Sequence, residues 1–489
     1  MSKYNNSKKN NILDNTNTTR PLDNTADTHG ADASWDTDYA WVSGVIGAAA
    51  LIICAGWYKS ADIMSRGLSI AGVRVTGDRT DTLLAAVLII SGVMILVEFV
   101  RLWRRHGRNF LQPSPLLEQR EYGQLLLAGF WRFALNLCMF YLIVLLYHWA
   151  VVYGFQEGKR YYLPWFRVLD YLFTFYCWVG LPYTWLTLAY KHDPVADRKD
   201  PSKLILFVLE CALYSGRRVL KAFDQQRHAI PQWTENHKKG LLSIIVKVFF
   251  APLMTVFFCD QFPHLVNNLG YLYDLIFSDA ARNYTHQRFN SDLFNISIGF
   301  IFSIDVALAW CGYVISSRWV GNHTQSAEPT SLGWLVCIFC YPPFQFYLGL
   351  YYGAPSEREV LNFSNQWLTT IFSTLMVLSY LLYMSATMWF GVRFSNLTNR
   401  GIIRKGPFAY VRHPAYASKN FAWWCVMFPV IVYNAFENAE IALLQTFGLC
   451  LMTWIYYMRA MTEERHLSSD PDYVTYREQV KYRFIPGVF

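Results

Sequence analysis

The chain has 489 residues, of which 53% are hydrophobic, 17% aromatic and only 16% charged. A soluble chain of this length would form about two or three domains with polar surfaces, and so few charged residues argue against that arrangement. The net charge of +8 is not gathered in a basic stripe with interleaved aromatic residues, so we expect no nucleic-acid partner.

The ten cysteines lie mostly within apolar runs, where they act as small hydrophobic residues. Cys337 and Cys340 form a C-x-x-C pair, but no histidine and no second pair accompany them. A zinc or redox site normally needs such partners. We therefore predict no metal site.

From the N-terminus, residues 1–35 are rich in Asn, Thr and Asp and contain no apolar segment, which predicts a disordered tail. Stretches of about 20 apolar residues, the length that crosses a bilayer, follow. They are Ala40–Tyr58, Thr82–Val100, Leu125–Val152, Leu169–Tyr190, Leu241–Phe258, Leu293–Ile315, Leu332–Tyr352, Trp367–Phe390, Phe421–Phe436 and Ile441–Met458. The sequence thus predicts an all-α integral membrane protein with about ten transmembrane helices.

Loop charges predict the orientation of these spans. The tail, the loops after the second, fourth, sixth and eighth spans, and the C-terminus carry about 31 Lys and Arg, against about 10 in the opposite loops. Both termini should therefore be cytoplasmic. In one of these loops, Leu204–Phe223 combines an apolar face with basic residues and should lie on the anionic inner surface or bind a partner.

Two ionisable residues fall inside predicted spans, Lys247 in the fifth and Asp305 in the sixth. Charges at that depth are costly and usually functional. They could form a buried pair or serve a substrate path. The Tyr341-Pro342-Pro343-Phe344 stretch should kink the seventh span or open it toward a cavity.

The polar stretch that begins at residue 393 differs in character from the spans before it. It contains Phe394–Gly401 and then Gly406-Pro407-Phe408-Ala409-Tyr410-Val411-Arg412-His413-Pro414-Ala415-Tyr416. The prolines should force turns that hold Arg412 and His413 at the mouth of the last helical hairpin, which turns at Glu437–Glu440. We therefore divide the chain by function into a tail (1–35), a multi-span body (36–392) and a catalytic region (393–489).

The end of the last span carries a second charged group. Arg459 and Glu463 are four residues apart and share a helical face, while Glu464 is rotated by about 100° from Glu463. Cations and carboxylates thus converge on both ends of the hairpin, where an amphiphile and a charged cofactor could meet. Taken singly, these residues could equally be headgroup anchors.

The ordered set resembles the isoprenylcysteine carboxyl methyltransferase and phospholipid methyltransferase superfamily over about the last 100 residues. The shared pattern is G-P-Y-x-x-x-R-H-P-x-Y, a helical hairpin, R-x-x-x-E-E-x-x-L, a Y-x-x-Y pair and a basic-aromatic-Pro tail. One departure is Phe408, which replaces the usual Tyr and removes a hydroxyl. The first 390 residues are longer than the few spans typical of that family.

The resemblance implies an S-adenosylmethionine-dependent membrane methyltransferase with a cytoplasmic-side cofactor pocket on the C-terminal hairpin. Its acceptor would be a lipid-like or prenylated molecule, most simply a carboxylate, that enters from the membrane lipids. Cofactor contacts carried over from the family are Tyr410, Arg412, His413, Pro414, Tyr416, Glu464 and Arg483. The resemblance places Arg459 and Glu463 at the acceptor as the catalytic pair.

Two other functions compete with this one. Membrane sterol and enone reductases share the R-H-P-x-Y hairpin, bind NADPH and match the number of spans better. The Glu463-Glu464 pair favours the methyltransferase, because carboxylates attract a sulfonium but repel a 2′-phosphate. A non-enzymatic transporter or lipid-binding protein would use the polar span residues and leave the motif without a role.

Overall fold

The protein is an all-α membrane protein. The computed structural model describes residues 36–150, 161–220, 230–278, 284–342, 344–345 and 365–488. The tail predicted for residues 1–35 lies outside the described residues. Within these ranges, four short strands form two antiparallel pairs, β1 (Ser69–Ile70) with β2 (Val73–Arg74) and β3 (Ser326–Ala327) with β4 (Thr398–Asn399).

Ten helices of 20 or more residues are described. They are α2 (Trp41–Ser60), α4 (Arg79–His106), α6 (Tyr122–Ala150), α7 (Leu163–Tyr190), α9 (Pro201–Leu220), α10 (Glu235–Phe277), α11 (His286–Val314), α15 (Gln366–Phe390), α16 (Pro414–Glu437) and α17 (Ala439–Leu467). Shorter elements are α3 (Ile63–Arg66), η1 (Gly107–Phe110), α5 (Pro115–Glu118), α8 (Pro194–Asp197), η4 (Arg318–Val320), α12 (Ser331–Ile338), η5 (Gly391–Arg393), η6 (Gly406–Ala409) and α18 (Pro471–Gln479).

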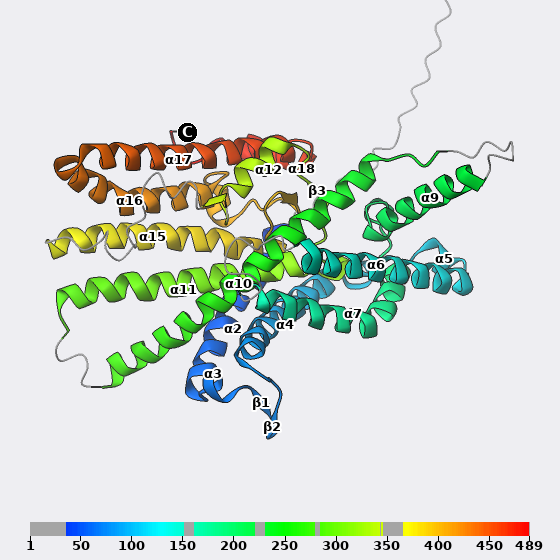
Figure 1. Ribbon diagram of the computed structural model, residues 1–489, viewed down its shortest axis with the longest axis horizontal. Coiled ribbons are helices and arrows are strands. Elements are labelled where there is room, and N and C mark those ends of the chain that lie inside the picture. The colour runs from blue at the N-terminus through cyan, green and yellow to red at the C-terminus, as the bar shows by residue number, and fades with distance from the viewer. Residues whose placement is uncertain are drawn as a thin grey trace, which may run out of the picture.

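The helices pack in two groups on either side of α10 (Figure 1). Helices α11, α15, α16 and α17 pack one against the next, and α12 lies against α17. On the other side, α6 packs against α7 and α9. Helices α2 and α4 pair with each other and contact both α10 and α11, and α2 also contacts α15, so this pair joins the two groups. Figure 1 shows α10 running diagonally across the molecule between the two groups.

Seven described helical segments are long and apolar enough to cross a membrane, and they contain α2, α4, α6, α10, α11, α15 and α17. Two further predicted spans coincide with the long helices α7 and α16, which do not meet both criteria. The predicted span Leu332–Tyr352 begins with α12, which ends at Ile338, and residues 346–352 lie outside the described residues. The membrane-helix architecture is confirmed, while the number of ten spans stays a prediction.

Helix α10 is much longer than the predicted span Leu241–Phe258. It has 43 residues and continues through Pro252 and Pro263. At a rise of about 1.5 Å per residue it measures roughly 64 Å, about twice the thickness of a hydrocarbon core. The hydropathy pattern underestimated it because polar residues, beginning with Asp260, follow Phe258 without ending the helix.

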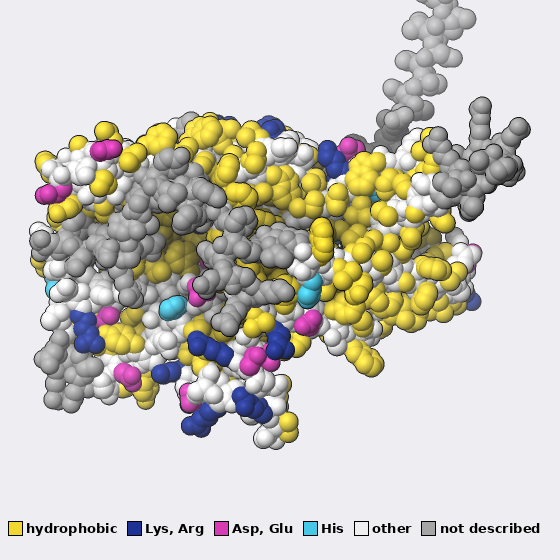
Figure 2. All heavy atoms as spheres, viewed as in Figure 1, with side chains coloured by type: hydrophobic (Ala, Val, Ile, Leu, Met, Phe, Trp, Pro, Cys, Tyr) yellow, Lys and Arg dark blue, Asp and Glu magenta, His cyan; other side chains and the backbone are white. Residues whose placement is uncertain are grey.

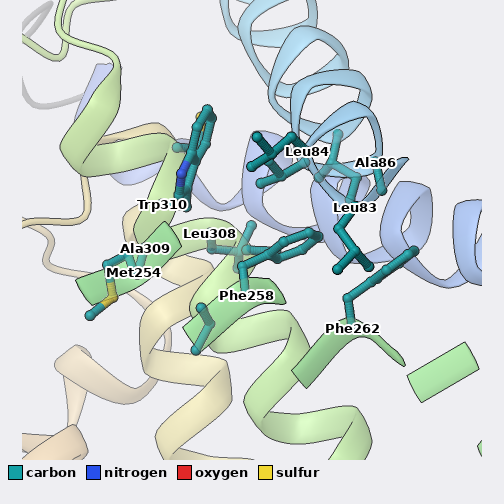
Figure 3. Close-up of a cluster of buried hydrophobic side chains, with 14 of the residues drawn as sticks. Leu83, Leu84, Ala86, Met254, Phe258, Phe262, Leu308, Ala309 and Trp310 are labelled. Atoms are coloured by element: carbon teal, nitrogen blue, oxygen red, sulfur yellow. The ribbon is translucent and has the colours of Figure 1, made fainter. Parts of the chain in front are cut away.

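The largest buried cluster lies where α4, α10 and α11 meet. Figure 3 shows Leu84, Phe258 and Trp310 pointing into this cluster, and all three are at most 1% exposed. The Trp310 indole also donates to Thr255 Oγ1 at 2.9 Å, so its one polar atom is satisfied. Close van der Waals packing of this kind is what holds helices together inside a bilayer.

Buried polar contacts join the multi-span body to residues 393–489. The Arg393 guanidinium donates to Glu98 Oε1 at 2.8 Å, and both side chains are at most 3% exposed. Arg101 donates to the other Glu98 oxygen at 3.0 Å. Strand β3 from the body pairs with β4 from the C-terminal region. The predicted functional boundary near residue 393 is therefore not a break in packing.

Apolar side chains cover much of the outer surface. Figure 2 shows hydrophobic side chains spread over the region of α6 and α9. Trp149 in α6 and Trp178 in α7 are 84% and 80% exposed. Exposed large apolar side chains are unfavourable in water and suit helices that face lipid.

Candidate functional site

The turn that contains Arg412 and His413 is held by a proline and by the C-terminal tail. Pro414 occupies the first turn of α16, where its fixed φ and missing N–H suit a helix start. The backbone N–H of Arg412 donates to Tyr482 O at 3.0 Å, and that of His413 donates to Arg483 O at 2.9 Å. The tail after α18 therefore fixes the backbone of this turn.

Glu464 is the centre of a buried ionic cluster. Its Oε1 accepts from Arg412 Nε at 2.8 Å and lies 3.2 Å from His413 Nε2. Arg483 Nε donates to both carboxylate oxygens at 3.3 Å. Arg412, His413 and Glu464 are all at most 8% exposed, so these charges are shielded from water. Charge-assisted contacts of this kind are strong and hold their members in place.

Glu463 faces a different partner from its neighbour. Its Oε2 accepts a hydrogen bond from the Tyr416 hydroxyl at 2.6 Å. The Tyr416 ring in turn stacks on His413, with ring centroids 5.5 Å apart and planes 4° apart. The two adjacent carboxylates therefore occupy separate environments, as the helical periodicity of α17 requires.

The Arg459 guanidinium lies among three tyrosine rings. Its carbon is 4.9 Å from the ring centroid of Tyr416, 5.7 Å from that of Tyr456 and 5.8 Å from that of Tyr341. It also donates a hydrogen bond to Asn396 Oδ1. Arg459 is 6% exposed, so a cation is held in a nearly dry, aromatic setting.

These groups line a cavity of about 100 Å³, which we call the C-terminal cavity. Its walls come from α15, α16, α17, the 394–398 loop and the segment around α12. The polar side chains on them include Glu328, Tyr341, Tyr383, Thr387, Asn396, Arg412, His413, Tyr416, Lys419, Tyr456, Arg459, Glu463 and His466. Basic side chains (Arg412, Lys419 and Arg459) and carboxylates (Glu328 and Glu463) thus line the same cavity.

Asp305 is bound by two side chains that line this cavity and forms no ion pair with Lys247. Its carboxylate accepts from Tyr383 Oη at 2.9 Å and from Thr387 Oγ1 at 2.6 Å, and both of these side chains line the cavity. Lys247 lines a separate cavity beside α6 and α7. The pairing considered from the sequence is therefore not formed, because Asp305 is held by Tyr383 and Thr387 while Lys247 faces the other cavity.

Not every residue predicted for the cofactor reaches the cavity. Tyr410 is 71% exposed, and Pro414 is buried at the start of α16. Glu464 and Arg483 stand behind Arg412 and His413 and do not line the space. The structure thus brings Arg412, His413, Tyr416, Arg459 and Glu463 to one cavity and holds Glu464 and Arg483 as their support.

Several lining residues were not singled out from the sequence as site residues. Tyr456 lies three residues before Arg459 in α17, so helical spacing could have identified it. Asn396 lies in the motif stretch, but its contact is with Arg459, 63 residues away, so no local pattern could have identified it. Glu328 is 2% exposed and accepts from Arg465 at 3.0 Å, and no local pattern around it signals this.

Two tyrosines of α18, Tyr473 and Tyr476, are buried beside the ionic cluster around Glu464. Burial raises the pKa of both Tyr473 and Tyr476, so the phenols stay protonated. The Tyr476 hydroxyl donates to Phe408 O at 2.8 Å. Phe408 itself is 7% exposed and packs on Phe390 with ring centroids 5.2 Å apart, so its side chain fills space where a hydroxyl was expected from the family pattern.

No group of three or more His, Cys, Asp or Glu side chains is placed to hold a metal ion among the residues that the structure describes. The side chains that line the C-terminal cavity are arginines, a lysine, histidines, carboxylates and aromatic rings, among others. That donor set suits organic ions.

Residues 367–469 match the isoprenylcysteine carboxyl methyltransferase (ICMT) family. The match begins in α15, includes Arg412, Arg459 and Glu464, and stops before Arg483. No match was found among curated proteins or among solved structures. The ICMT match confirms the resemblance of the C-terminal region, and it indicates membrane methyltransferase activity for that region.

Proposed function

We propose that the protein is an integral membrane methyltransferase that uses S-adenosylmethionine and methylates a lipid-like or prenylated acceptor. The acceptor group that we favour is a carboxylate. The observation that carries the proposal is the arrangement of Arg459 and Glu463 in one cavity with Arg412 and His413, inside the segment that matches the ICMT family.

The donor set of the cavity suits this cofactor. Glu463 presents a carboxylate to the cavity, which would attract the sulfonium and the amino group. The face of Tyr416 can also receive a cation, as it already receives the Arg459 guanidinium. The enclosed volume of about 100 Å³ is below the roughly 300–1,000 Å³ of typical ligand pockets, so the cavity must open to admit a ligand of this size.

The side chains have separate roles in this proposal. Arg412 and His413 bind the cofactor, and Glu464 and Arg483 hold them in position. Arg459 binds the acceptor carboxylate, and the surrounding tyrosine rings exclude water from that contact. When bound, S-adenosylmethionine supplies a methyl group on a positively charged sulfur. Transfer forms an oxygen–carbon bond as the sulfur–carbon bond breaks, leaving a methyl ester and S-adenosylhomocysteine.

A carboxylate acceptor needs no base, because it has no proton to lose. Catalysis then rests on holding two reactants in line, which Arg459 and the Arg412–His413 turn would do within the one cavity that they line. An amine or hydroxyl acceptor would lose a proton, and Glu463 is the carboxylate that faces the cavity and could take it.

The proposal is tested by calorimetry on the purified full chain with S-adenosylhomocysteine and with NADPH. We expect the former to bind and the latter not to. A matched pair of acceptors then tests the chemistry: a farnesylated cysteine with a free carboxylate and the same molecule as its amide. Labelled methyl should transfer only to the carboxylate. NADPH binding without S-adenosylhomocysteine binding would favour the membrane reductase class.

We also propose that both termini and the C-terminal cavity face the cytoplasm, on the strength of the loop charges. Reporter fusions at the N-terminus and at the C-terminus should both give a cytoplasmic signal. An external C-terminus would separate the site from a cytoplasmic cofactor and would contradict this part of the proposal.

A further inference from the structure

A second and larger cavity lies between α6, α7 and α10, in the part of the chain outside the ICMT match. Its volume is about 470 Å³, within the range of about 300–1,000 Å³ that small-molecule pockets occupy. The segments before α9 and after α11 complete its walls. We call it the N-terminal cavity. None of its lining residues belongs to the C-terminal cavity.

The lining of this cavity changes from polar to apolar along its length. On α6 the lining residues run from Arg132 and Asn136 through Met139 and Phe140 to Ile143 and Tyr147. On α7 they run the opposite way, from Trp165, Leu169 and Leu172 to Tyr183, Thr184 and Thr187.

The two helices are antiparallel, so the polar residues of α6 and α7 lie at the same end of the cavity and their apolar residues lie at the other end. Tyr147 packs on Trp165 at one end, with ring centroids 5.6 Å apart, and the Trp185 indole donates to Leu126 O toward the other. Arg132 and Tyr147 are separated by about 22 Å of helix, enough for an extended acyl or prenyl chain.

Most charges at the polar end neutralise each other. Arg132 donates to Asp197 at 2.6 Å and also binds Asp200, while Arg318 donates to Asp197 at 2.8 Å. Two arginines thus face two aspartates. Lys199, which also lines the cavity, donates to Gln325 O at 2.8 Å and forms no ion pair among the described residues.

Lys247 is a second lysine of the cavity that takes no part in this ion-pair network. Its side chain lines the cavity and forms no hydrogen bond or ion pair with any residue that the structure describes. Arg400, 3% exposed, repels Lys247 and has two guanidinium nitrogens without hydrogen-bond partners, while Asp200 attracts Lys247 from beyond ion-pair distance. Unpaired charge inside a membrane protein is costly and is usually retained for a ligand or ion.

Buried polar atoms without partners are also found around the same space. The Trp165 indole nitrogen has no hydrogen-bond partner although the residue is only 5% exposed. Asn136 Oδ1, His323 Nδ1 and Thr324 Oγ1 are likewise buried and unpaired, and all four residues line the cavity. Such atoms are normally satisfied. Trp165 lies beside Tyr147 at the apolar end, so the atoms that indicate a ligand head at the polar end are those of His323 and Thr324.

We propose that the N-terminal cavity binds one single-chain anionic amphiphile. Its carboxylate or phosphate head lies against Lys247, His323 and the Thr324 hydroxyl, and its apolar chain follows the Met139–Ile143 side of α6. A lipid chain accounts for the apolar half, and an anionic head accounts for the excess positive charge. The proposal concerns binding alone and does not depend on the methyltransferase proposal.

The test is native mass spectrometry of the full chain in a neutral detergent with hexadecyl phosphate, palmitate and hexadecanol, each added separately. We expect one copy of an anionic amphiphile to be retained and hexadecanol to be lost. The relative retention of phosphate and carboxylate then distinguishes the two heads. Equal retention of hexadecanol would overturn the proposal, because the charge would then contribute nothing.

Lys247→Met should weaken retention of the anionic amphiphile at least tenfold, as expected for the loss of a charge-assisted contact. The variant should fold, since it replaces a buried unpaired charge by an apolar chain of similar length. Lys239→Met is the matched control, because Lys239 is exposed on the same helix and does not line the cavity. Unchanged retention in Lys247→Met, or equal losses in both variants, would contradict the proposal.

Ile143→Trp provides an independent check, because it narrows the apolar half and leaves every charge in place. Its expected result is loss of hexadecyl phosphate, with the midpoint of thermal unfolding and the elution volume unchanged. Full retention of hexadecyl phosphate would place the chain elsewhere and overturn the proposed orientation.

Discussion

The two cavities differ in how their charges are balanced. In the C-terminal cavity, Glu464 is shared by Arg412, His413 and Arg483, and Glu463 is bound by Tyr416. In the N-terminal cavity, Lys247 has no such partner among the described residues. Matched charges fix the geometry that a reaction needs, whereas an unmatched charge keeps its capacity for a ligand. The C-terminal cavity is thus suited to holding reactants in a fixed geometry, and the N-terminal cavity is suited to binding an anionic ligand.

The largest effect should follow from breaking the contact between the two regions. Glu98→Gln leaves Arg101 and Arg393 without their counter-charge in a site where Glu98 is fully buried. Removing one partner of a buried ion pair costs about 3–5 kcal/mol. We therefore expect a markedly lower midpoint of thermal unfolding, measured by circular dichroism in detergent.

The matched control for this substitution is Glu118→Gln, because Glu118 is exposed in the short helix α5. It should leave the midpoint unchanged. If Glu98→Gln also left it unchanged, residues 36–392 and 393–489 would be stabilised independently, and the buried contact between them would matter little.

A smaller effect should separate the roles within the C-terminal cavity. Glu464→Gln weakens the hold on Arg412 and His413, so S-adenosylhomocysteine affinity should fall at least tenfold in calorimetry. Arg459→Ala should leave that affinity unchanged and abolish methyl transfer. Arg459 contacts Asn396 and three rings and has no contact with Glu464.

Glu463→Gln serves as the neighbouring control for Glu464→Gln, since it changes the same charge on another face of α17. It should weaken S-adenosylhomocysteine binding through the lost attraction for the amino group, but less than Glu464→Gln does, because Glu464 holds both Arg412 and His413. If Arg459→Ala weakened cofactor binding as much as Glu464→Gln does, Arg459 would belong to the cofactor set. The acceptor group would then have to be sought elsewhere, with Asp305 the first candidate.

Local patterns predicted much of this arrangement. Apolar runs located nine of the ten long helices, and the spacing of Arg459, Glu463 and Glu464 correctly placed the two carboxylates on different faces of α17. The turn at Asn438, which caps α17 through Ile441 N, was also visible as a polar break between two apolar runs. These features depend on neighbours within one or two helical turns.

Features that depend on distant contacts could not be predicted. Asn396 reaches Arg459 across 63 residues, and Glu98 reaches Arg393 across 295 residues. The sequence likewise left open whether Lys247 and Asp305 form a buried pair, because a single sequence does not show which residues of two spans face each other. Helices α10 and α11 do pack together, but Lys247 lines the N-terminal cavity, whereas Asp305 is bound by Tyr383 and Thr387.

The smallest expected effect concerns the polar end of the N-terminal cavity. Burial lowers the pKa of His323 from its ordinary value of 6.5 to about 4, against the attraction of Asp193 at 3.8 Å. Arg318, Arg393 and Lys199 add to the lowering. The folded protein therefore keeps this ring neutral under conditions in which the unfolded chain already binds a proton.

The sign of the pH dependence follows from this difference. As the pH falls from 6.5 to about 4, the unfolded state takes up a proton that the folded state refuses, so stability decreases over that window and not above it. The His323 side chain is 32% exposed, so water screens the effect to about 1 kcal/mol.

His323→Gln should remove this part of the loss of stability, measured as the unfolding midpoint from pH 7 to pH 4. The control His264→Gln, at an exposed position, should not remove it. Bound hexadecyl phosphate should reduce the loss in the wild-type protein, because an anionic head stabilises the protonated ring. If hexadecyl phosphate binds and the loss is unchanged, its head does not lie near His323 and must contact Lys247 from another side of the cavity.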